Sequence, residues 1–268
     1  SHAYQVKRRY FDQSSMYIHT LKPELSTAET ILRAIRADKK YTEEEARLLD
    51  LCLIVHADHG GGNNSTFTTR VLTSSHTDTF ATLSAAIGSL KGPRHGGANL
   101  KVAEMLEHMA PAISDPTDEA AVKDYLAKIV RKEVGDKSGL IYGMGHAVYT
   151  ISDPRAVILK EEARKVAEGT ELEREFLLLD AIERLSPGVL NEIKGSNRAI
   201  CANVDLYSGL IYRSLGIPSD LFTPLFAVAR MAGWCAHRME ELATGGRIIR
   251  PAYKAVSNNV VYVPMDER

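Results

Sequence analysis

The sequence predicts an all-α fold, because apolar residues recur at helical spacing along most of its 268 residues. Two capping boxes mark helix starts, one formed by Ser26 with Glu29 and the other by Thr42 with Glu45. A single short stretch, residues 260–263, has the β-branched character of a strand. We therefore expect helices packed on helices, with almost no sheet.

The helices that follow these two caps differ in their apolar surface. The first, after Ser26, has one apolar stripe, as is typical of a helix that covers a core with one face. The second, after Thr42, is apolar on nearly every side over residues 46–55, so we expect it to be buried all round. It delivers His56 and His59 to its C-terminal end.

Periodicity predicts a further series of helices along the rest of the chain. At residues 79–90, alanine, serine and glycine would allow close approach of another helix. Asp153 followed by Pro154 is a good start signal, because proline fits the first turn of a helix. Beyond Pro93 the expected helices cover residues 100–109, 118–134, 154–167, 171–185 and 223–242.

Composition excludes several classes of protein. Hydrophobic residues make up 44% of the chain, which suits a globular protein with a core. The 33 lysines and arginines nearly balance the 34 aspartates and glutamates, so no overall field would attract nucleic acid or an anionic membrane. No run approaches the roughly 18 to 20 apolar residues of a membrane span, and the polar, basic start lacks the apolar stretch of a signal peptide. We expect a cytoplasmic protein.

The three cysteines do not suggest a disulfide framework. Cys52, Cys201 and Cys235 are odd in number, far apart and set in apolar sequence that we expect to be helical. This pattern is typical of reduced thiols in a core, in agreement with the expected compartment.

Ionisable side chains lie beside glycines in four short segments, each at an expected helix boundary. Glycine allows a ligand to approach the backbone closely, and a helix end offers unpaired N–H or C=O groups and a dipole. Taken singly, each segment is a weak indication of a site. The segments are HADHGGGN at residues 56–63, GPRHGGAN at 92–99, GMGH at 143–146 with DPR at 153–155, and NVD at 203–205 with SG at 208–209.

Two other kinds of site are compatible with parts of this pattern. Cys52, His56 and His59 have a spacing that could place them on one helical face, as zinc ligands are, but no fourth ligand is evident nearby. Residues 60–62 could surround a phosphate, but no lysine followed by serine or threonine completes a P-loop. A lone helix-end histidine is also often a hydrogen-bonded residue without catalytic duty. We predict no metal site.

Taken together and in this order, the four segments resemble the citrate synthase family. The resemblance runs from about residue 4 to residue 253 and includes LIVHADHGGGNNSTF, GSLKGPRHGGAN, GMGHAVYTISDPRA, NVDLYSG and RIIRPAY. It implies an all-α fold with a large and a small helical domain and an active-site cleft between them. Residues 1–95 and 217–268 would form the large domain, and residues 96–216 the small one. Family members are substantially longer, so we expect this chain to match their C-terminal portion, without the N-terminal helical region.

The resemblance also implies two sets of functional residues. The first set would carry out the chemistry and consists of His95, His146 and Asp205. The second set would bind oxaloacetate or citrate and consists of His59, Asn63, Arg155, Arg230 and Arg250.

The chemistry of the implied reaction suits these residue types. A thioester methyl group is a very weak carbon acid, so its deprotonation needs a carboxylate base, here Asp205, and a donor to the developing oxygen charge. His95 would be that donor, and we expect the helix start beside it to hold down the pKa of its imidazole. His146 would polarise the ketone of the 2-oxo acid.

Arginines suit a substrate with two carboxylates, because the planar guanidinium grips a carboxylate with two parallel hydrogen bonds. Arg230 lies inside an apolar expected helix, which favours a functional role over a surface position. In the family the arginine that matches Arg250 reaches the site of the neighbouring subunit. The resemblance therefore implies a homodimer with two shared sites.

Coenzyme A would take part as a thioester co-substrate, with no permanently bound cofactor. In the family, the loop that matches residues 140–145 receives the adenine largely through backbone groups. We predict a phosphate contact from Arg198, for which a solvated loop arginine is an equal alternative. The coenzyme A residues would be Leu140, Ile141, Tyr142, Gly143, Gly145 and Arg198.

The function implied is that of citrate synthase, an acyltransferase of the tricarboxylic acid cycle. It would condense acetyl-CoA with oxaloacetate and hydrolyse citryl-CoA to citrate and CoA. Three alternatives stay open: 2-methylcitrate synthase, whose propionyl-CoA differs by one methylene and thus by only about 1–3 kcal/mol of discrimination; citryl-CoA cleavage; and a non-catalytic, truncated domain that binds ligands without turnover.

Overall fold

The structure, a computed structural model, describes residues 2–146, 148–252, 254 and 261–268. Its described part is helical, without strands, and one isolated antiparallel bridge pairs Met144 with Ala202. The α-helices are α1 (His2–Tyr10), α2 (Thr27–Ile35), α3 (Glu43–His56), α4 (Asn64–Ser74), α5 (Thr79–Leu90), α6 (Ala98–Met109), α7 (Glu119–Val130), α8 (Pro154–Ala167), α9 (Glu173–Lys194), α10 (Asp205–Ser214) and α11 (Phe222–Thr244). Two short 3₁₀ helices are η1 (Ser219–Leu221) and η2 (Met265–Glu267).

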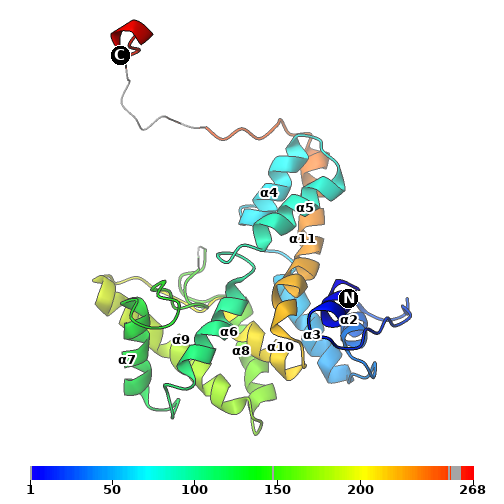
Figure 1. The fold of residues 1–268 in the computed structure, drawn as a ribbon, viewed down its shortest axis with the longest axis vertical. Coiled ribbons are helices and arrows are strands. Elements are labelled where there is room, and N and C mark those ends of the chain that lie inside the picture. Colours follow the sequence, from blue (N-terminus) through cyan, green and yellow to red (C-terminus); the bar gives the residue numbers. More distant parts are fainter. Residues whose placement is uncertain (1, 147, 253, 255–260) are drawn as a thin grey trace.

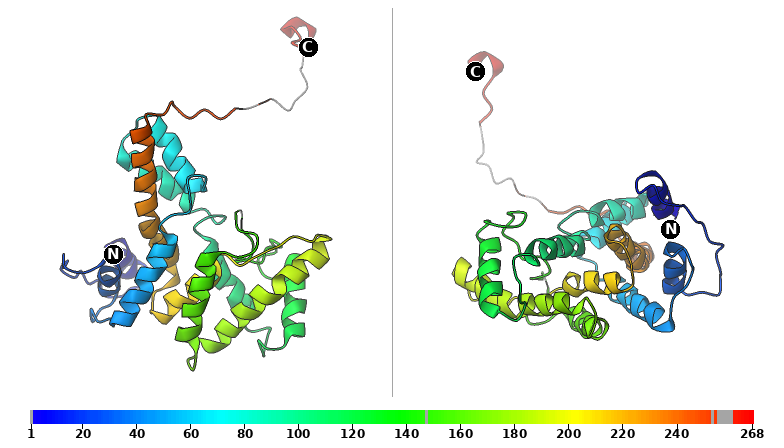
Figure 2. Two further views of the ribbon diagram at one scale, coloured as in Figure 1. Left: turned by 180° about the vertical axis from the view of Figure 1, so that it is seen from behind. Right: turned by 60° about the horizontal axis from the view of Figure 1, so that its bottom comes forward.

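The helices form two regions that α11 connects (Figures 1 and 2). We call α2, α3 and α6–α10 the helical body, and α4 and α5 with the second half of α11 the arm. The arm projects from the body, and the chain after α11 leaves the end of the arm as an extended segment (Figure 1). The start of α11 packs on the body and its remainder on the arm.

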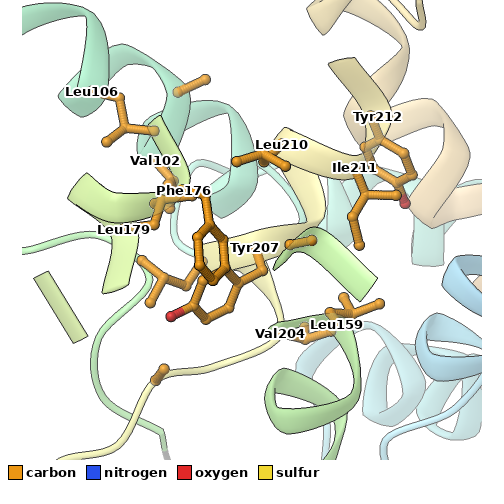
Figure 3. Close-up of a cluster of buried hydrophobic side chains, with 14 of the residues drawn as sticks. Val102, Leu106, Leu159, Phe176, Leu179, Val204, Tyr207, Leu210, Ile211 and Tyr212 are labelled. Carbon is orange, nitrogen blue, oxygen red and sulfur yellow. The ribbon is translucent and has the colours of Figure 1, made fainter. Parts of the chain in front are cut away.

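The helical body has one large apolar core that runs from α2 and α3 through α6, α8, α9 and α10. Helix α10 lies at its centre, with almost every residue buried (Figure 3). The ring of Tyr207 packs against Phe176, with 6.2 Å between ring centroids, and its hydroxyl donates to Glu183 Oε2 at 2.5 Å. Helix α10 begins with Asp205, so this packing also holds the backbone of Asp205 in place.

The arm has a small apolar core and many buried polar groups. Its buried apolar residues are Ala86, Leu90, Phe226 and Trp234. Hydroxyls take up much of the remaining interior, from Ser65, Thr66, Thr69, Thr73 and Thr82. The buried guanidinium of Arg238 donates to the hydroxyls of Thr73, Thr79 and Thr82 and to the carbonyl of Thr77, at 2.9–3.2 Å. Hydrogen bonds thus replace part of the apolar packing here.

The capping predictions are confirmed. Both boxes form as expected, with the Ser26 and Thr42 side chains accepting from the third helical N–H and the glutamates reaching back. The expected helices at residues 79–90 and 154–167 have the predicted bounds. The helix predicted at 118–134 ends earlier, at Val130, because Lys132 adopts a left-handed φ of 66°.

Helix α9 extends nine residues beyond its predicted end at residue 185 and contains Pro187. A proline inside a helix costs about 3 kcal/mol, so an early end was the local expectation. Val189 and Leu190 lie beyond the proline and are buried in the core of the body, and this burial offsets the cost.

Three expectations are wrong. The helix at residues 46–55 is not buried all round, because Ile54 is 63% exposed on the face that no other element covers. Residue 260 lies outside the described residues, and residues 261–263 form no strand because none of the described chain pairs with them. Cys201 lies in a non-helical segment, although all three thiols are free as predicted.

Periodicity missed three helices, α1, α4 and α10. Helix α4 is rich in serine and threonine and has no apolar stripe, since its buried face consists of hydroxyls. The proposed domain division at residues 96–216 stays a prediction. None of the described helices has both the length and the apolar character needed to cross a membrane.

Candidate active site

Helix α8 begins with a buried aspartate that holds an arginine in place. Asp153 caps the helix by accepting from the backbone N–H of Arg155 at 3.0 Å. The same carboxylate binds the Arg155 guanidinium in a bidentate pair, with Nε–Oδ1 at 3.0 Å and NH2–Oδ2 at 2.8 Å. This pairing lowers the pKa of Asp153 against the effect of its burial. Arg155 is therefore a fixed cation at the end of α8.

His146 is held in one tautomer by the backbone that follows it. Its Nδ1 accepts from the N–H groups of Val148 and Tyr149, each at 2.9 Å. A neutral imidazole that accepts at Nδ1 carries its proton on Nε2. Arg155 NH2 lies 3.2 Å from that Nε2, so two donors meet there and a ligand oxygen would be bound by both. Burial lowers the pKa of His146.

His59 packs against this pair. Its ring lies edge-on to that of His146, with 4.8 Å between centroids, and 6.0 Å from that of Tyr149. Burial, followed by the nearby charge of Arg155, lowers the pKa of His59 to about 4. The ring is thus neutral at physiological pH, and a neutral imidazole still has one N–H that can donate to an oxo acid.

Arg230 is a buried cation on α11. Its side chain has no exposed surface, and its Nε donates to the carbonyl of His56 at 2.7 Å and its NH1 to Asn63 Oδ1 at 3.2 Å. Both acceptors are neutral oxygens. Burial lowers the pKa of Arg230 to about 10, so the charge persists at neutral pH. A buried guanidinium with neutral partners is a favourable place for an anion.

His95 lies at the junction of the body and the arm. Its Nε2 is 2.9 Å from Ser65 Oγ, which also accepts from Trp234 Nε1 at 3.1 Å and reaches Asn63 Oδ1 at 3.0 Å. Burial and then the charge of Arg230 lower the pKa of His95 to about 4. This direction agrees with the predicted neutral imidazole, and burial is its first cause.

Asp205 is a second buried carboxyl of the site, besides Asp153. It starts α10, is 9% exposed, and its Oδ1 has no hydrogen-bond partner within the described chain. Burial raises its pKa to about 7, while the charges of Arg155 and Arg230 act in the opposite direction. Both arginines also lower the pKa of His59, and Arg230 lowers that of His95. The carboxyl, the arginines and the histidines are therefore close enough for their charges to interact.

An open pocket adjoins His146. It collects four of the six predicted coenzyme A residues, namely Leu140, Ile141, Gly145 and Arg198, and adds Lys194, which the sequence analysis missed. Tyr142 and Gly143 do not line it. The Tyr142 hydroxyl donates to Asp136 Oδ2 at 2.5 Å, and Gly143 packs so tightly on Leu206 that a Cβ there would lie 2.7 Å from its side chain.

Arg250 does not join these residues within this chain. It lies exposed in the extended segment after α11, which runs away from the body (Figure 1). The N–H of Ile249 donates to Ser74 Oγ at 3.0 Å and so ties the start of that segment to α4.

Several residues that shape the site have no role in the predictions from sequence. Ser65 and Asn203 stand in the quoted segments but were given no role, and Asp153 was noted only as a helix cap. The zinc alternative is not favoured, because His59 packs against His146 whereas His56 Nδ1 binds the Cys52 carbonyl at 2.7 Å. Across the described residues, no group of three or more His, Cys, Asp or Glu side chains could hold a metal ion.

Comparison with known proteins gives a consistent family. The family described as citrate synthase, C-terminal domain, matches residues 2–252. The citrate synthase of Synechocystis sp. is 41% identical over 224 residues, which cover 83% of this chain and 52% of that protein. The citrate synthase of Acidithiobacillus ferridurans is 40% identical over 248 residues, which cover 92% of this chain and 60% of that protein. The chain thus spans between half and two thirds of the length of these relatives.

Solved structures agree. The citrate synthase of Thermotoga maritima superposes with a TM-score of 0.77 at 32% identity, covering 99% of this chain and 66% of that one. A citrate synthase of Thermoplasma acidophilum was solved in a ternary complex with carboxymethyl coenzyme A and oxaloacetate. It superposes with a TM-score of 0.76 at 31% identity, covering 98% of this chain and 65% of that one. The resemblance carried by the four segments is confirmed, and the chain belongs to the citrate synthase family.

Proposed function

We propose that this protein condenses acetyl-CoA with oxaloacetate and hydrolyses the resulting citryl-CoA to citrate and CoA. The observation that carries the proposal is one neighbourhood containing a buried carboxyl with a pKa of about 7, neutral histidines and two fixed arginines. The ternary complex of the Thermoplasma relative supports the choice of substrates.

Asp205 is the proposed base. A carboxyl with a pKa near neutrality is a far better proton acceptor than an ordinary aspartate, yet it is still ionised in a large fraction of molecules at pH 7. Its unpartnered Oδ1 is available for the methyl group of the thioester. The neighbouring arginines stabilise the ionised form enough to keep the base usable.

His95 is the proposed donor to the thioester oxygen. Ser65 has one hydroxyl proton and two acceptors within reach, Asn63 Oδ1 and His95 Nε2. When Ser65 donates to Nε2, the histidine carries its own proton on Nδ1 and can donate it to the thioester. The low pKa ensures that the donor is a neutral imidazole, which yields an enol and not a free enolate.

His146 and the arginines are the proposed oxaloacetate site. The fixed Nε2–H of His146 would donate to the ketone oxygen, on which negative charge develops as the carbon–carbon bond forms. Arg155 and Arg230 would bind the carboxylates, with His59 and Asn63 beside them. The pocket with Arg198 and Lys194 would receive the coenzyme, with the thioester end toward His146.

Arg250 is proposed to complete the site of a second copy of the chain. The arm supports this, because it exposes large apolar side chains on α5 and α11, such as Phe80 at 86% and Met239 at 71%. We further propose that residues 96–216 form the small domain and close over the substrates, which would exclude water before the thioester is activated.

Thiol release from acetyl-CoA and propionyl-CoA, each with and without oxaloacetate, tests the proposal. We expect release that requires oxaloacetate, favours acetyl-CoA and is lost in Asp205→Ala. A higher rate with propionyl-CoA would identify a 2-methylcitrate synthase instead. Oxaloacetate binding without any turnover would favour the non-catalytic alternative, which a chain of the full length of the relatives would then check.

The shared site has its own test. Asp205→Ala and Arg250→Ala should each be inactive, but a mixture allowed to exchange subunits should regain about a quarter of the activity, because one site of each mixed dimer is intact. No recovery despite demonstrated subunit exchange would show that Arg250 serves its own chain.

A further inference from the structure

We propose that Asn203 is a positioning residue that sets the geometry between the base Asp205 and the ketone-polarising His146. The inference rests on the proposed function and goes beyond it by assigning a role to a residue whose side chain binds the backbone of both segments. Asn203 stands two residues before Asp205 and across from Gly145, which immediately precedes His146.

The side-chain amide of Asn203 bridges the two catalytic segments. Its Oδ1 accepts from the backbone N–H of Asp205 at 3.0 Å, and its Nδ2 donates to the carbonyl of Gly145 at 3.0 Å. That carbonyl belongs to the peptide that links Gly145 to His146. One rigid planar group therefore orients the backbone of both residues.

The backbone groups of Asn203 are also hydrogen-bonded. Its N–H donates to the carbonyl of Gly143 at 2.9 Å, and its carbonyl accepts from Leu206 N–H at 3.2 Å. Gly145 N–H donates to the carbonyl of Cys201 at 2.8 Å beside the isolated bridge. Segments 143–145 and 201–203 are thus paired by backbone hydrogen bonds. The side-chain amide of Asn203 adds a hydrogen bond to Asp205 and one to the peptide that precedes His146.

No other small side chain can replace the amide. Aspartate would keep the acceptor for Asp205 N–H but would set a carboxylate oxygen against the carbonyl of Gly145. Serine could cap Asp205 but is too short to reach Gly145 as well. Because the reacting carbons must meet within a small tolerance, loss of this link should slow the chemistry more than it weakens substrate binding.

The test compares Asn203→Ala with the native protein and with Asp118→Ala. The control likewise removes a side chain that makes two hydrogen bonds to the backbone at a helix start, but on α7, where Asp118 accepts from the N–H groups of Ala120 and Ala121. For Asn203→Ala we expect kcat to fall about 10- to 100-fold while KM for oxaloacetate changes by less than about twofold. Asp118→Ala should leave both constants unchanged. An Asn203→Ala variant that behaves like the control, or that changes KM alone, would overturn the inference.

A pH profile tests the proximity of the Asn203 side chain to Asp205. The groups that act on Asp205 are Arg155, Arg230 and Asp153. Asn203→Asp adds a carboxylate next to the Asp205 backbone, so the ascending limb of kcat against pH should move to higher pH. An unmoved limb would contradict the proposed contact.

Hydrogen exchange separates this inference from the proposed function. In Asn203→Ala, amides in residues 143–146 should exchange faster than in the native protein, whereas Asp118→Ala should leave them protected. If the native protein releases no thiol, the proposed function fails, and the exchange result alone decides: unchanged protection refutes the link through Asn203, and lost protection supports it.

Discussion

The helical body and the arm are stabilised in different ways. The body buries a continuous set of large apolar side chains around α10 (Figure 3). The arm instead has a small apolar cluster and an interior filled with hydroxyls and the guanidinium of Arg238. The candidate site draws on both. His146, Arg155 and Asp205 come from the body, and His95 is held by Ser65 of the arm.

This difference explains how the site combines rigidity with polar character. Apolar packing around α10 fixes Asp205 without offering it hydrogen bonds, which is why its pKa rises. Hydrogen bonds are directional, and those of the arm hold the hydroxyl of Ser65 in one position. Ser65 in turn contacts His95 through one ring nitrogen, Nε2. The body thus supplies an apolar environment for the site, and the arm supplies directional hydrogen bonds.

The largest expected effect compares equal truncations in the two cores. Leu179→Ala in the body should lower the free energy of unfolding by about 2–5 kcal/mol, near the upper end because the residue is fully buried within the large cluster. Leu90→Ala in the small cluster of the arm should cost less, about 2 kcal/mol. Urea denaturation measures both, and equal costs would remove the distinction between the regions.

The junction of the regions should be sensitive to a single methyl group. A Cβ at Gly233 of α11 would lie 2.3 Å from the carbonyl oxygen of Ala57 and 2.9 Å from Asp58 Oδ1. Gly233→Ala should therefore cost about 3 kcal/mol and raise KM for oxaloacetate by displacing His59. The control is Gly88→Ala in α5, where nothing lies within 4 Å and the change should stabilise by up to about 1 kcal/mol.

Replacing buried and exposed arginines should separate the two regions further. Arg238→Met leaves buried hydroxyls and the carbonyl of Thr77 without a donor, at a cost of about 2 kcal/mol. Arg184→Met in the body removes half-exposed ion pairs with Glu119 and Asp180, at a cost below about 1 kcal/mol. Thermal unfolding of the two variants gives the comparison, and the reverse order would contradict it.

The smallest expected effect is a gain. Asp205 has a pKa of about 7 in the folded protein against an ordinary value of 3.8, so the folded state holds a proton that the unfolded state has released between these values. Its ionisation therefore destabilises the fold increasingly from pH 4 to pH 7. Asp205→Asn should be inactive but more stable by about 1–2 kcal/mol at pH 8, since the buried amide retains part of the polar cost.

Most of the gain should disappear at pH 4, where the native residue is protonated in the folded state and only about half ionised in the unfolded state. Melting temperatures of the variant and the native protein at the two pH values check this. A gain of equal size at both pH values would show that relieved packing, and not the charge, was responsible.

Much of the fold could be predicted from sequence, whereas the roles of the site residues stay predictions. Capping residues and a single apolar stripe are local signals, so α2, α5 and α8 were placed well. Helix α4 was missed because a hydroxyl-lined interior leaves no apolar period, and α9 was cut short because its proline was weighed without the packing beyond it. The exposed side of α3 at Ile54 depends on which neighbours are present, and periodicity carries no information about that.

The sequence by itself determined the helical class, the capped helix starts and the motif residues that mark the family, because these depend on short-range geometry and on residue identity. Only the tertiary structure decided how those residues are arranged. It fixed the tautomer of His146, linked His95 to Ser65, buried Asp205 and joined the segments of His146 and Asp205 through Asn203. The physical reason is that protonation, burial and hydrogen-bond direction are set by contacts between residues far apart in the chain.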